Sequence, residues 1–65
     1  MGGENYFHWH DGVEFDRESN TWRGYIEDND YTRKVMGDDT FAEKGDAVKA
    51  AGEMLAQARH GNPPG

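Results

Sequence analysis

The sequence predicts a small α+β domain in which a three-stranded antiparallel meander packs on one C-terminal helix, in the order βββα. Two observations lead to this prediction. Residues 13–16 and 22–27 alternate apolar with charged or polar side chains, which is the period of a half-buried strand. Residues 44–59 carry apolar side chains at three- and four-residue steps, which is the period of an amphipathic helix.

The first two strands form a predicted hairpin with a single inner face. That face consists of Val13, Phe15, Trp22 and Ile26. Residues 17–21 are a polar loop, in which Asn20 is the residue best suited to a left-handed backbone conformation. A second short loop, residues 28–30, leads into a third strand over residues 31–36. Because both loops are short, an antiparallel meander is favoured.

The predicted helix covers one face of this sheet. Its apolar stripe consists of Ala47, Val48, Ala51, Met54, Leu55 and Ala58. Gly45 and Gly52 each cost about 1 kcal/mol relative to alanine, so tertiary packing must stabilise the helix. We expect Glu43 to cap the first turn, Arg59 to lie at the negative end of the helix and Gly61 to terminate it.

Length and composition allow one domain. The chain has 65 residues, of which 34% are hydrophobic and none is cysteine. We expect a domain over residues 6–59, with flexible tails at residues 1–5 and 60–65. A chain without thiols suits the reducing cytoplasm. Apolar runs are only a few residues long, and residues 1–6 lack the basic start and apolar centre of a signal peptide, so no membrane span or leader is predicted.

Negative charge is concentrated in the predicted hairpin. The formal net charge of the chain is -6. Residues 11–30 hold seven acids and two bases, a net of -5, whereas the acids and bases of residues 31–65 cancel. We therefore expect the function to lie in the first half of the chain.

The sheet face that the helix leaves uncovered is the candidate protein-binding surface. Its predicted residues are Glu14, Asp16, Arg23, Tyr25 and Glu27. Carboxylates raise the rate of encounter with positively charged surfaces, and Tyr25 offers an aromatic anchor. The alternative is an ordinary solvated face.

Two histidines are weak candidates for metal ligands. In an extended strand His8 and His10 point to the same side, where two imidazoles could share an ion. A closed site needs further ligands, and His60 is the only other histidine. The simpler interpretation is a solvated strand edge with Phe7 and Trp9 packed beneath it, so we expect neither a metal nor a cofactor.

Catalysis is not predicted. Ser19 is the only serine, it lies in a predicted loop, and the chain lacks the strand-to-helix elbow of serine hydrolases. Adjacent acids such as Glu27 and Asp28 are more simply solvated turns than an enclosed acid–base pair. Residues 28–30 resemble the start of a calcium loop but lack its glycine and its distant glutamate, so we expect a turn.

The order and spacing of the core residues suggest a known family. The residues concerned are Gly12, Val13, Phe15, Asp16, Trp22, Arg23, Tyr25, Ile26, Gly37, Phe41, Ala47, Ala50 and Ala51. Over about residues 12–58 the chain resembles the ethylene-response-factor type of DNA-binding domain, including the versions in phage homing endonucleases. The resemblance implies three strands packed on a helix, with basic and aromatic side chains of the free sheet face reading the major groove.

The positions that read DNA in that family differ here. Glu14 and Asp16 stand where the family has arginines, and Glu27 ends the second strand. Carboxylates at these positions oppose binding to phosphates. DNA or RNA binding is therefore the alternative function, and the residues suited to it are Arg23, Tyr25, Arg33 and Lys34.

A second resemblance concerns the entry to the helix. Residues 41–51 follow the pattern Phe-x-x-x-x-Asp-Ala-x-x-Ala-Ala and are similar to the N-terminal domain of HicB-type antitoxins and to several tiny phage proteins. The similarity implies the same strand-and-helix plan. A basic RNase toxin is a sensible partner for an acidic sheet, so a toxin-neutralising domain is another alternative.

Together these observations predict a non-enzymatic, cytoplasmic protein-binding module of phage or prophage origin. We expect it to inhibit or modulate a host protein with a basic surface, such as one that binds nucleic acid. The chain is expected to be a monomer or a homodimer. One alternative is a homodimer that hides Phe7, Trp9 and Tyr25 between two sheets.

Overall fold

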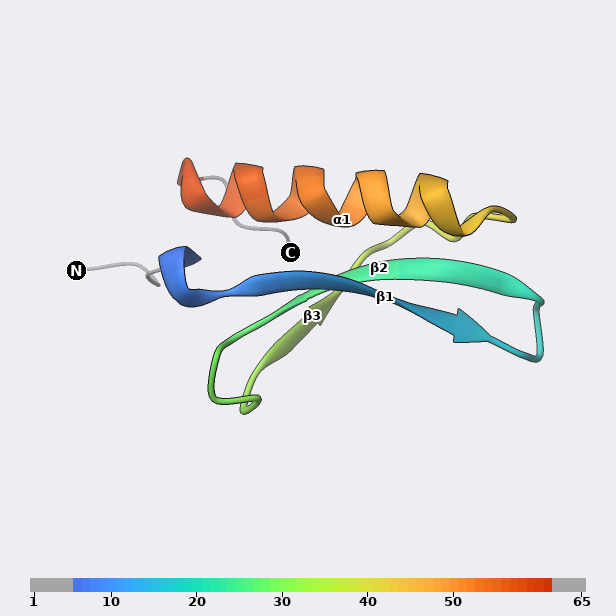
Figure 1. Ribbon diagram of the computed structural model, residues 1–65, viewed down its shortest axis with the longest axis horizontal. Helices are drawn as coiled ribbons and strands as arrows, with labels where there is room; N and C mark the ends of the chain where they lie inside the picture. Colours follow the sequence, from blue (N-terminus) through green and yellow to red (C-terminus); the bar gives the residue numbers. More distant parts are fainter. Residues whose placement is uncertain (1–5, 62–65) are drawn as a thin grey trace.

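The protein folds as a three-stranded antiparallel sheet with one helix lying along one of its faces (Figure 1). The computed structural model describes residues 6–61. Its elements are η1 (Tyr6–His8), β1 (His10–Asp16), β2 (Thr21–Glu27), β3 (Lys34–Met36) and α1 (Lys44–Arg59). The strand order is β1-β2-β3, so β2 is the central strand. The predicted βββα meander is confirmed.

The register of the β1–β2 hairpin fixes the two faces of the sheet. Val13 lies opposite Gly24, and Glu14 lies opposite Arg23. Asn20 in the connecting turn has φ 59, so the predicted left-handed residue is confirmed. Gly24 faces the helix, and side chains alternate between the two faces of a strand. Val13, Phe15, Trp22 and Ile26 therefore share the inner face, as predicted.

Close approach of the helix to β2 depends on small residues. A Cβ built on Gly24 would lie only 2.9 Å from the carbonyl oxygen of Ala47 and 2.9 Å from Cβ of Ala51. Both alanines are fully buried. The core continues toward the C-terminal end of α1, where the buried side chains are those of Trp9, Ile26, Leu55 and Ala58. Packing against the sheet thus stabilises the helix and offsets the low helix propensity of Gly45 and Gly52.

The ends of α1 agree with the predicted bounds, and Glu43 and Arg59 lie at its first and last turns as predicted, but the Glu43 side chain does not cap the helix. Glu43 occupies the N-cap position in an extended conformation, yet its side chain makes no capping hydrogen bond. Arg59 donates to the carbonyl oxygens of Tyr6 (3.3 Å), Phe7 (3.4 Å) and Trp9 (3.1 Å) rather than to the end of its own helix. Gly61 has φ 89 and ends the helix as predicted.

The third strand is shorter than predicted, because the loop before it extends to residue 33. Thr32 and Arg33 donate their backbone N–H groups to the carboxylate of Asp28, at 2.8 and 3.1 Å. Tyr31 has φ 60, which ends any extended run through that residue. The prediction of a strand from residue 31 is therefore wrong, whereas the predicted turn at residues 28–30 is confirmed.

The predicted tails lie mostly outside the described residues. Of the C-terminal segment, only His60 and Gly61 belong to the described part, and the N-terminal segment 1–5 lies outside it. Between residues 6 and 61, no helix combines the length and the apolar character needed to cross a membrane.

Candidate functional site: the open face of the sheet

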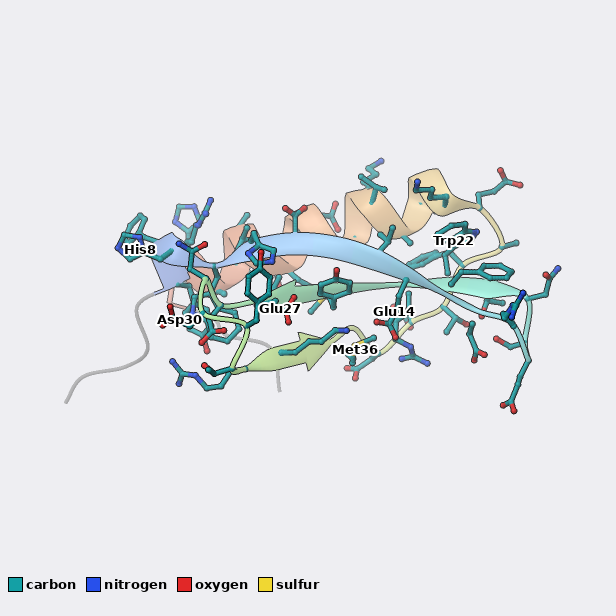
Figure 2. The ribbon with its side chains drawn as sticks, turned by 60° about the horizontal axis from the view of Figure 1, so that its bottom comes forward. His8, Glu14, Trp22, Glu27, Asp30 and Met36 are labelled. Atoms are coloured by element: carbon teal, nitrogen blue, oxygen red, sulfur yellow. The ribbon has the colours of Figure 1, made fainter. Side chains whose placement is uncertain are left out.

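The sheet face turned away from α1 is termed the open face, and by the strand register all five predicted protein-binding residues lie on it. Figure 2 labels two of them, Glu14 and Glu27. Side-chain alternation from Gly24 assigns ten residues to this face. They are His10, Gly12, Glu14 and Asp16 of β1, Thr21, Arg23, Tyr25 and Glu27 of β2, and Lys34 and Met36 of β3.

A cation–aromatic cluster occupies the centre of the open face. Lys34 lies with Nζ 2.7 Å from Oε1 of Glu14 and 4.3 Å from the centroid of the Tyr25 ring. The hydrogen bond to Glu14, reinforced by nearby carboxylates, raises the pKa of Lys34 above its usual value of 10.5. Tyr25 fits because its partner in β1 is Gly12, where a Cβ would lie 2.5 Å from the tyrosine hydroxyl. The ring therefore packs over the Gly12 backbone and is contacted by the Lys34 ammonium group.

The other cations suited to nucleic acid are also engaged within the chain. Arg23 donates from Nη1 to the carbonyl oxygen of Gly37. Arg33 lies in the loop before β3, with Nε 3.8 Å from Oδ2 of Asp28 and its guanidinium carbon 5.5 Å from the centroid of the Trp9 ring. Arg33 thus lies outside the strands of the open face, so the four alternative residues do not form one surface.

The open face is less acidic than the hairpin sequence alone indicates. It carries three acids (Glu14, Asp16 and Glu27) against two bases (Arg23 and Lys34), a net of -1. Lys34 reaches this face because β3 pairs with β2 on the side opposite β1. Negative charge at the two ends of the face, at Asp16 and Glu27, flanks the central cluster.

The two candidate metal ligands do not share a strand. His8 belongs to η1 and is exposed, whereas His10 begins β1 on the open face. Nε2 of His10 is 3.6 Å from Oε1 of Glu27, and its ring meets that of Tyr31 edge to face at 5.5 Å. The expected extended path through both histidines is wrong, because the η1 turn precedes the strand. Among residues 6–61, no group of three or more ligand side chains could hold a metal ion.

The aromatic residues near the N-terminus also differ from expectation. Trp9 is buried in the core beside Tyr6, with ring centroids 4.7 Å apart, whereas Phe7 is 70% exposed. The expectation that both Phe7 and Trp9 pack beneath the strand is correct only for Trp9. Trp9 is thus already buried within one chain, and the alternative of a homodimer between two sheets stays a prediction.

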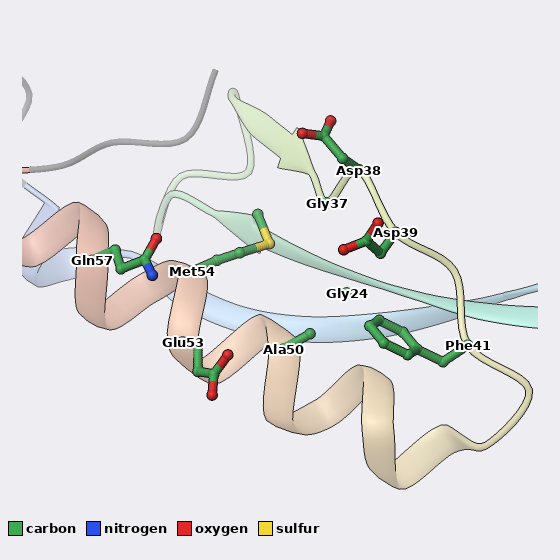
Figure 3. Close-up of a pocket in the computed structure, with 9 residues that line it drawn as sticks. All are labelled: Gly24, Gly37, Asp38, Asp39, Phe41, Ala50, Glu53, Met54 and Gln57. Atoms are coloured by element: carbon green, nitrogen blue, oxygen red, sulfur yellow. The ribbon is translucent and has the colours of Figure 1, made fainter.

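Sequence reasoning missed a hollow on the helix side of the molecule (Figure 3). The hollow measures about 170 Å³ and lies between α1 and the segment that follows β3. Its lining includes the acids Asp38, Asp39 and Glu53 and the apolar side chains of Phe41 and Met54. The hollow depends on the path of the chain after β3, so the local apolar pattern of the sequence gives no signal for it.

Comparison of the chain with protein-family models, with curated proteins and with solved structures finds no match. The resemblances to the ethylene-response-factor domain and to the HicB-type antitoxins therefore stay predictions.

Proposed function

We propose that the protein is a non-enzymatic binding module that docks the basic surface of a protein partner through its open face. The observation that carries the proposal is the internal use of the cations on and beside this face. Arg23 is bound to Gly37, Lys34 to Glu14 and Arg33 to Asp28. With the cations engaged and a chain net charge of -6, the field around the protein attracts positive surfaces.

The geometry of the open face suits this kind of docking. Asp16 and Glu27 lie at opposite ends of β1 and β2, where they orient an approaching cationic surface. Tyr25 lies between them, and its ring is packed over the Gly12 backbone and contacted by Lys34. An aromatic anchor with few accessible conformations loses little entropy on binding. Glu14 can exchange Lys34 for a cation of the partner.

Nucleic-acid binding, the alternative, is disfavoured by the same contacts. A polyanion is bound by neutralising its phosphates with lysine and arginine. Here Arg23, Arg33 and Lys34 would first have to leave acceptors of their own chain, and three carboxylates would remain on the surface that faces the phosphates.

The proposal extends to the biological setting. We place the protein in the cytoplasm, because a chain without cysteine gains nothing from an oxidising compartment. A phage or prophage inhibitor of a host protein that binds nucleic acid, or an antitoxin-like partner of a basic RNase, would both use a surface of this kind. The small size and negative charge of the chain motivate the first class, and the resemblance to HicB-type antitoxins motivates the second.

Two defined probes test the proposal: a ten-residue arginine peptide and a 20-base-pair DNA duplex, each titrated into ¹⁵N-labelled protein. We expect the peptide to shift the amide signals of Asp16, Tyr25 and Glu27, with an affinity that falls as salt is raised. We expect the duplex to shift none of them. Binding of the duplex at micromolar protein concentration and low salt would contradict the proposal.

A matched pair of charge reversals identifies the face. Glu27→Lys acts on the open face and Glu53→Lys on the helix side, and both change the net charge by the same amount. We expect Glu27→Lys to weaken peptide binding and Glu53→Lys to leave it largely unchanged. If Glu53→Lys weakened peptide binding more than Glu27→Lys, the binding surface would be the acidic hollow beside α1 and not the open face.

A further inference from the structure

The outer edge of β1 is an unpaired strand edge seven residues long. β1 lies at the border of the sheet, and within residues 6–61 no segment pairs with it on the side away from β2. Figure 1 shows β1 running below α1. A strand edge of this length presents N–H and C=O groups that can pair with another strand.

The hydrogen bonds of β2 identify the residues of β1 that point outward. Trp22 exchanges backbone hydrogen bonds with Phe41, at 2.7 and 2.8 Å, and Gly24 accepts from the N–H of Gly37 at 2.8 Å. The even-numbered residues of β2 thus direct their backbone groups toward β3, and the odd-numbered ones direct theirs toward β1. By the register, His10, Gly12, Glu14 and Asp16 pair with β2. Asp11, Val13 and Phe15 direct both backbone groups to the free edge.

We propose that the free edge of β1 pairs with the same edge of a second copy, antiparallel, around a two-fold axis at Val13. In this register Val13 lies opposite Val13 of the second copy, and Asp11 lies opposite its Phe15. All three outward residues of each strand then make both backbone hydrogen bonds, six in total across the interface. A shift by two residues in either direction aligns only two of the three outward residues with one another.

Side chains on the open face agree with this register. His10 lies opposite Asp16 of the second copy, and Gly12 lies opposite its Glu14, so no carboxylate faces another directly. A shift of the register toward the C-terminal end of β1 would place Glu14 opposite Glu14, and like charges directly opposite each other destabilise a strand pair. The acids of β1 therefore disfavour this shift, whereas the opposite shift is disfavoured by its smaller number of paired outward residues.

Apolar side chains gather along the same edge on the helix side. Phe15 is 42% exposed although its ring packs on Trp22 with centroids 5.0 Å apart, and Val48 is 48% exposed. Val48 lies one helical turn before Gly52. A Cβ added at Gly52 would lie 3.8 Å from the carboxylate of Asp11 in β1. Val48 is thus on the side of α1 that faces β1. A two-fold axis perpendicular to the sheet puts both helices on one side, with these apolar side chains between them.

The resulting dimer has a continuous six-stranded sheet, two helices on one side and two open faces merged on the other. It goes beyond the proposed binding function, because a monomer could dock a basic surface equally well. Each copy carries a net charge of -6, so long-range repulsion opposes association at low salt. We therefore expect the dimer to be more populated at high salt, the opposite of the salt dependence expected for binding a basic partner.

Sedimentation and cysteine cross-linking test the proposal on the whole chain. We expect the dimer fraction to rise with concentration between about 10 µM and about 1 mM, the range of weak interfaces. Because the chain has no cysteine, a single introduced thiol reports its own two-fold neighbour. In Val13→Cys the two thiols lie on opposed residues about 5.5 Å apart at Cα, within disulfide range. We expect a reducible covalent dimer from Val13→Cys, and none from Arg17→Cys in the hairpin loop.

A proline variant tests the backbone pairing. The N–H of Val13 points outward, and proline is tolerated on an edge strand at such a position. We expect Val13→Pro to keep the circular-dichroism spectrum of the fold and to lose the dimer. A chain that stays monomeric at every concentration and salt would overturn the proposal. So would a dimer in which Met36→Cys on β3 cross-links and Val13→Cys does not.

Discussion

Lys34 of β3 contacts Glu14 of β1 across the central strand, with Nζ 2.7 Å from Oε1, although β1 and β3 do not pair with each other. The lysine side chain passes over the ring of Tyr25 in β2 to reach the carboxylate. One cation thus connects all three strands on the face that has no helix. This contact stabilises a short edge strand that otherwise pairs with β2 over only three residues.

Replacing Lys34 should therefore lower stability more than replacing another surface lysine. We expect Lys34→Met to lower the free energy of unfolding by about 0.5 to 1.5 kcal/mol, the range of an exposed ion pair combined with a cation–π contact. Lys49→Met on α1 is the control and should change it by less than about 0.5 kcal/mol. Urea unfolding measures both, and equal effects would contradict the role of the cross-strand contact.

The same contact has a defined dependence on pH. Because Glu14 raises the pKa of Lys34 in the folded state, its contribution is fully present below the ordinary lysine value of 10.5. It is lost as the pH rises through the higher folded value. We expect the stability difference between wild type and Lys34→Met to be constant from neutral pH to about pH 10 and to shrink above it. A difference that persists unchanged in strong alkali would show that the methylene chain, not the charge, is responsible.

Asp28 gives a pH dependence of the opposite sign. The hydrogen bond from the Thr32 hydroxyl, supported by the backbone N–H groups of residues 32 and 33, lowers the pKa of Asp28 below its ordinary value of 3.8. The stabilisation is therefore present above that value and is lost as the pH falls through the lower folded value. Asp28→Asn should be less stable than wild type at neutral pH, and the difference should disappear in acid. Asp30→Asn, exposed in the same loop, should show no such difference.

The loop at Asp28 also shows where sequence reasoning reaches its limit. The helix bounds and the hairpin faces follow from local periodicity, and both were predicted correctly. The start of β3 was not, because an aspartate side chain that binds nearby backbone N–H groups competes with strand pairing without altering the apolar pattern. Local periodicity also predicts which residues of β1 and β2 lie on the open face. The contact of Lys34 with Glu14 and the hollow beside Met54 depend on the non-local path of residues 34–41.

Replacing Gly24 and Gly52 by alanine should change the stability of the protein in opposite directions. At Gly24 an added Cβ would lie 2.9 Å from the backbone of α1, so Gly24→Ala must push the helix away from the sheet. We expect a loss of about 1 to 3 kcal/mol, typical of overpacking. At Gly52, in the middle of α1, the nearest atom beyond the helix backbone is Oδ2 of Asp11 at 3.8 Å, so Gly52→Ala should gain up to about 1 kcal/mol of helix propensity. Thermal unfolding of the two variants compares them directly, and a stabilising Gly24→Ala would contradict the close helix–strand packing.

Arg59 connects the two ends of the domain, and its replacement should release η1. The guanidinium group donates to the carbonyl oxygens of Tyr6, Phe7 and Trp9. Lysine keeps the charge but has no planar fork of donors, so Arg59→Lys should behave like Arg59→Gln rather than like wild type. Each variant should lose about 1 to 2 kcal/mol, the range of hydrogen bonds from a charged donor.

The fluorescence of Trp9 reports this release specifically when Trp22 is replaced by phenylalanine. Trp9 is only 5% exposed, so detachment of η1 should move its emission to longer wavelength in both Arg59 variants before the sheet unfolds. Lys49→Gln, elsewhere on α1, should leave the emission unchanged. Emission that shifts only together with the far-ultraviolet circular dichroism would mean that η1 and the sheet unfold as one unit, and that Arg59 stabilises the whole domain rather than this junction.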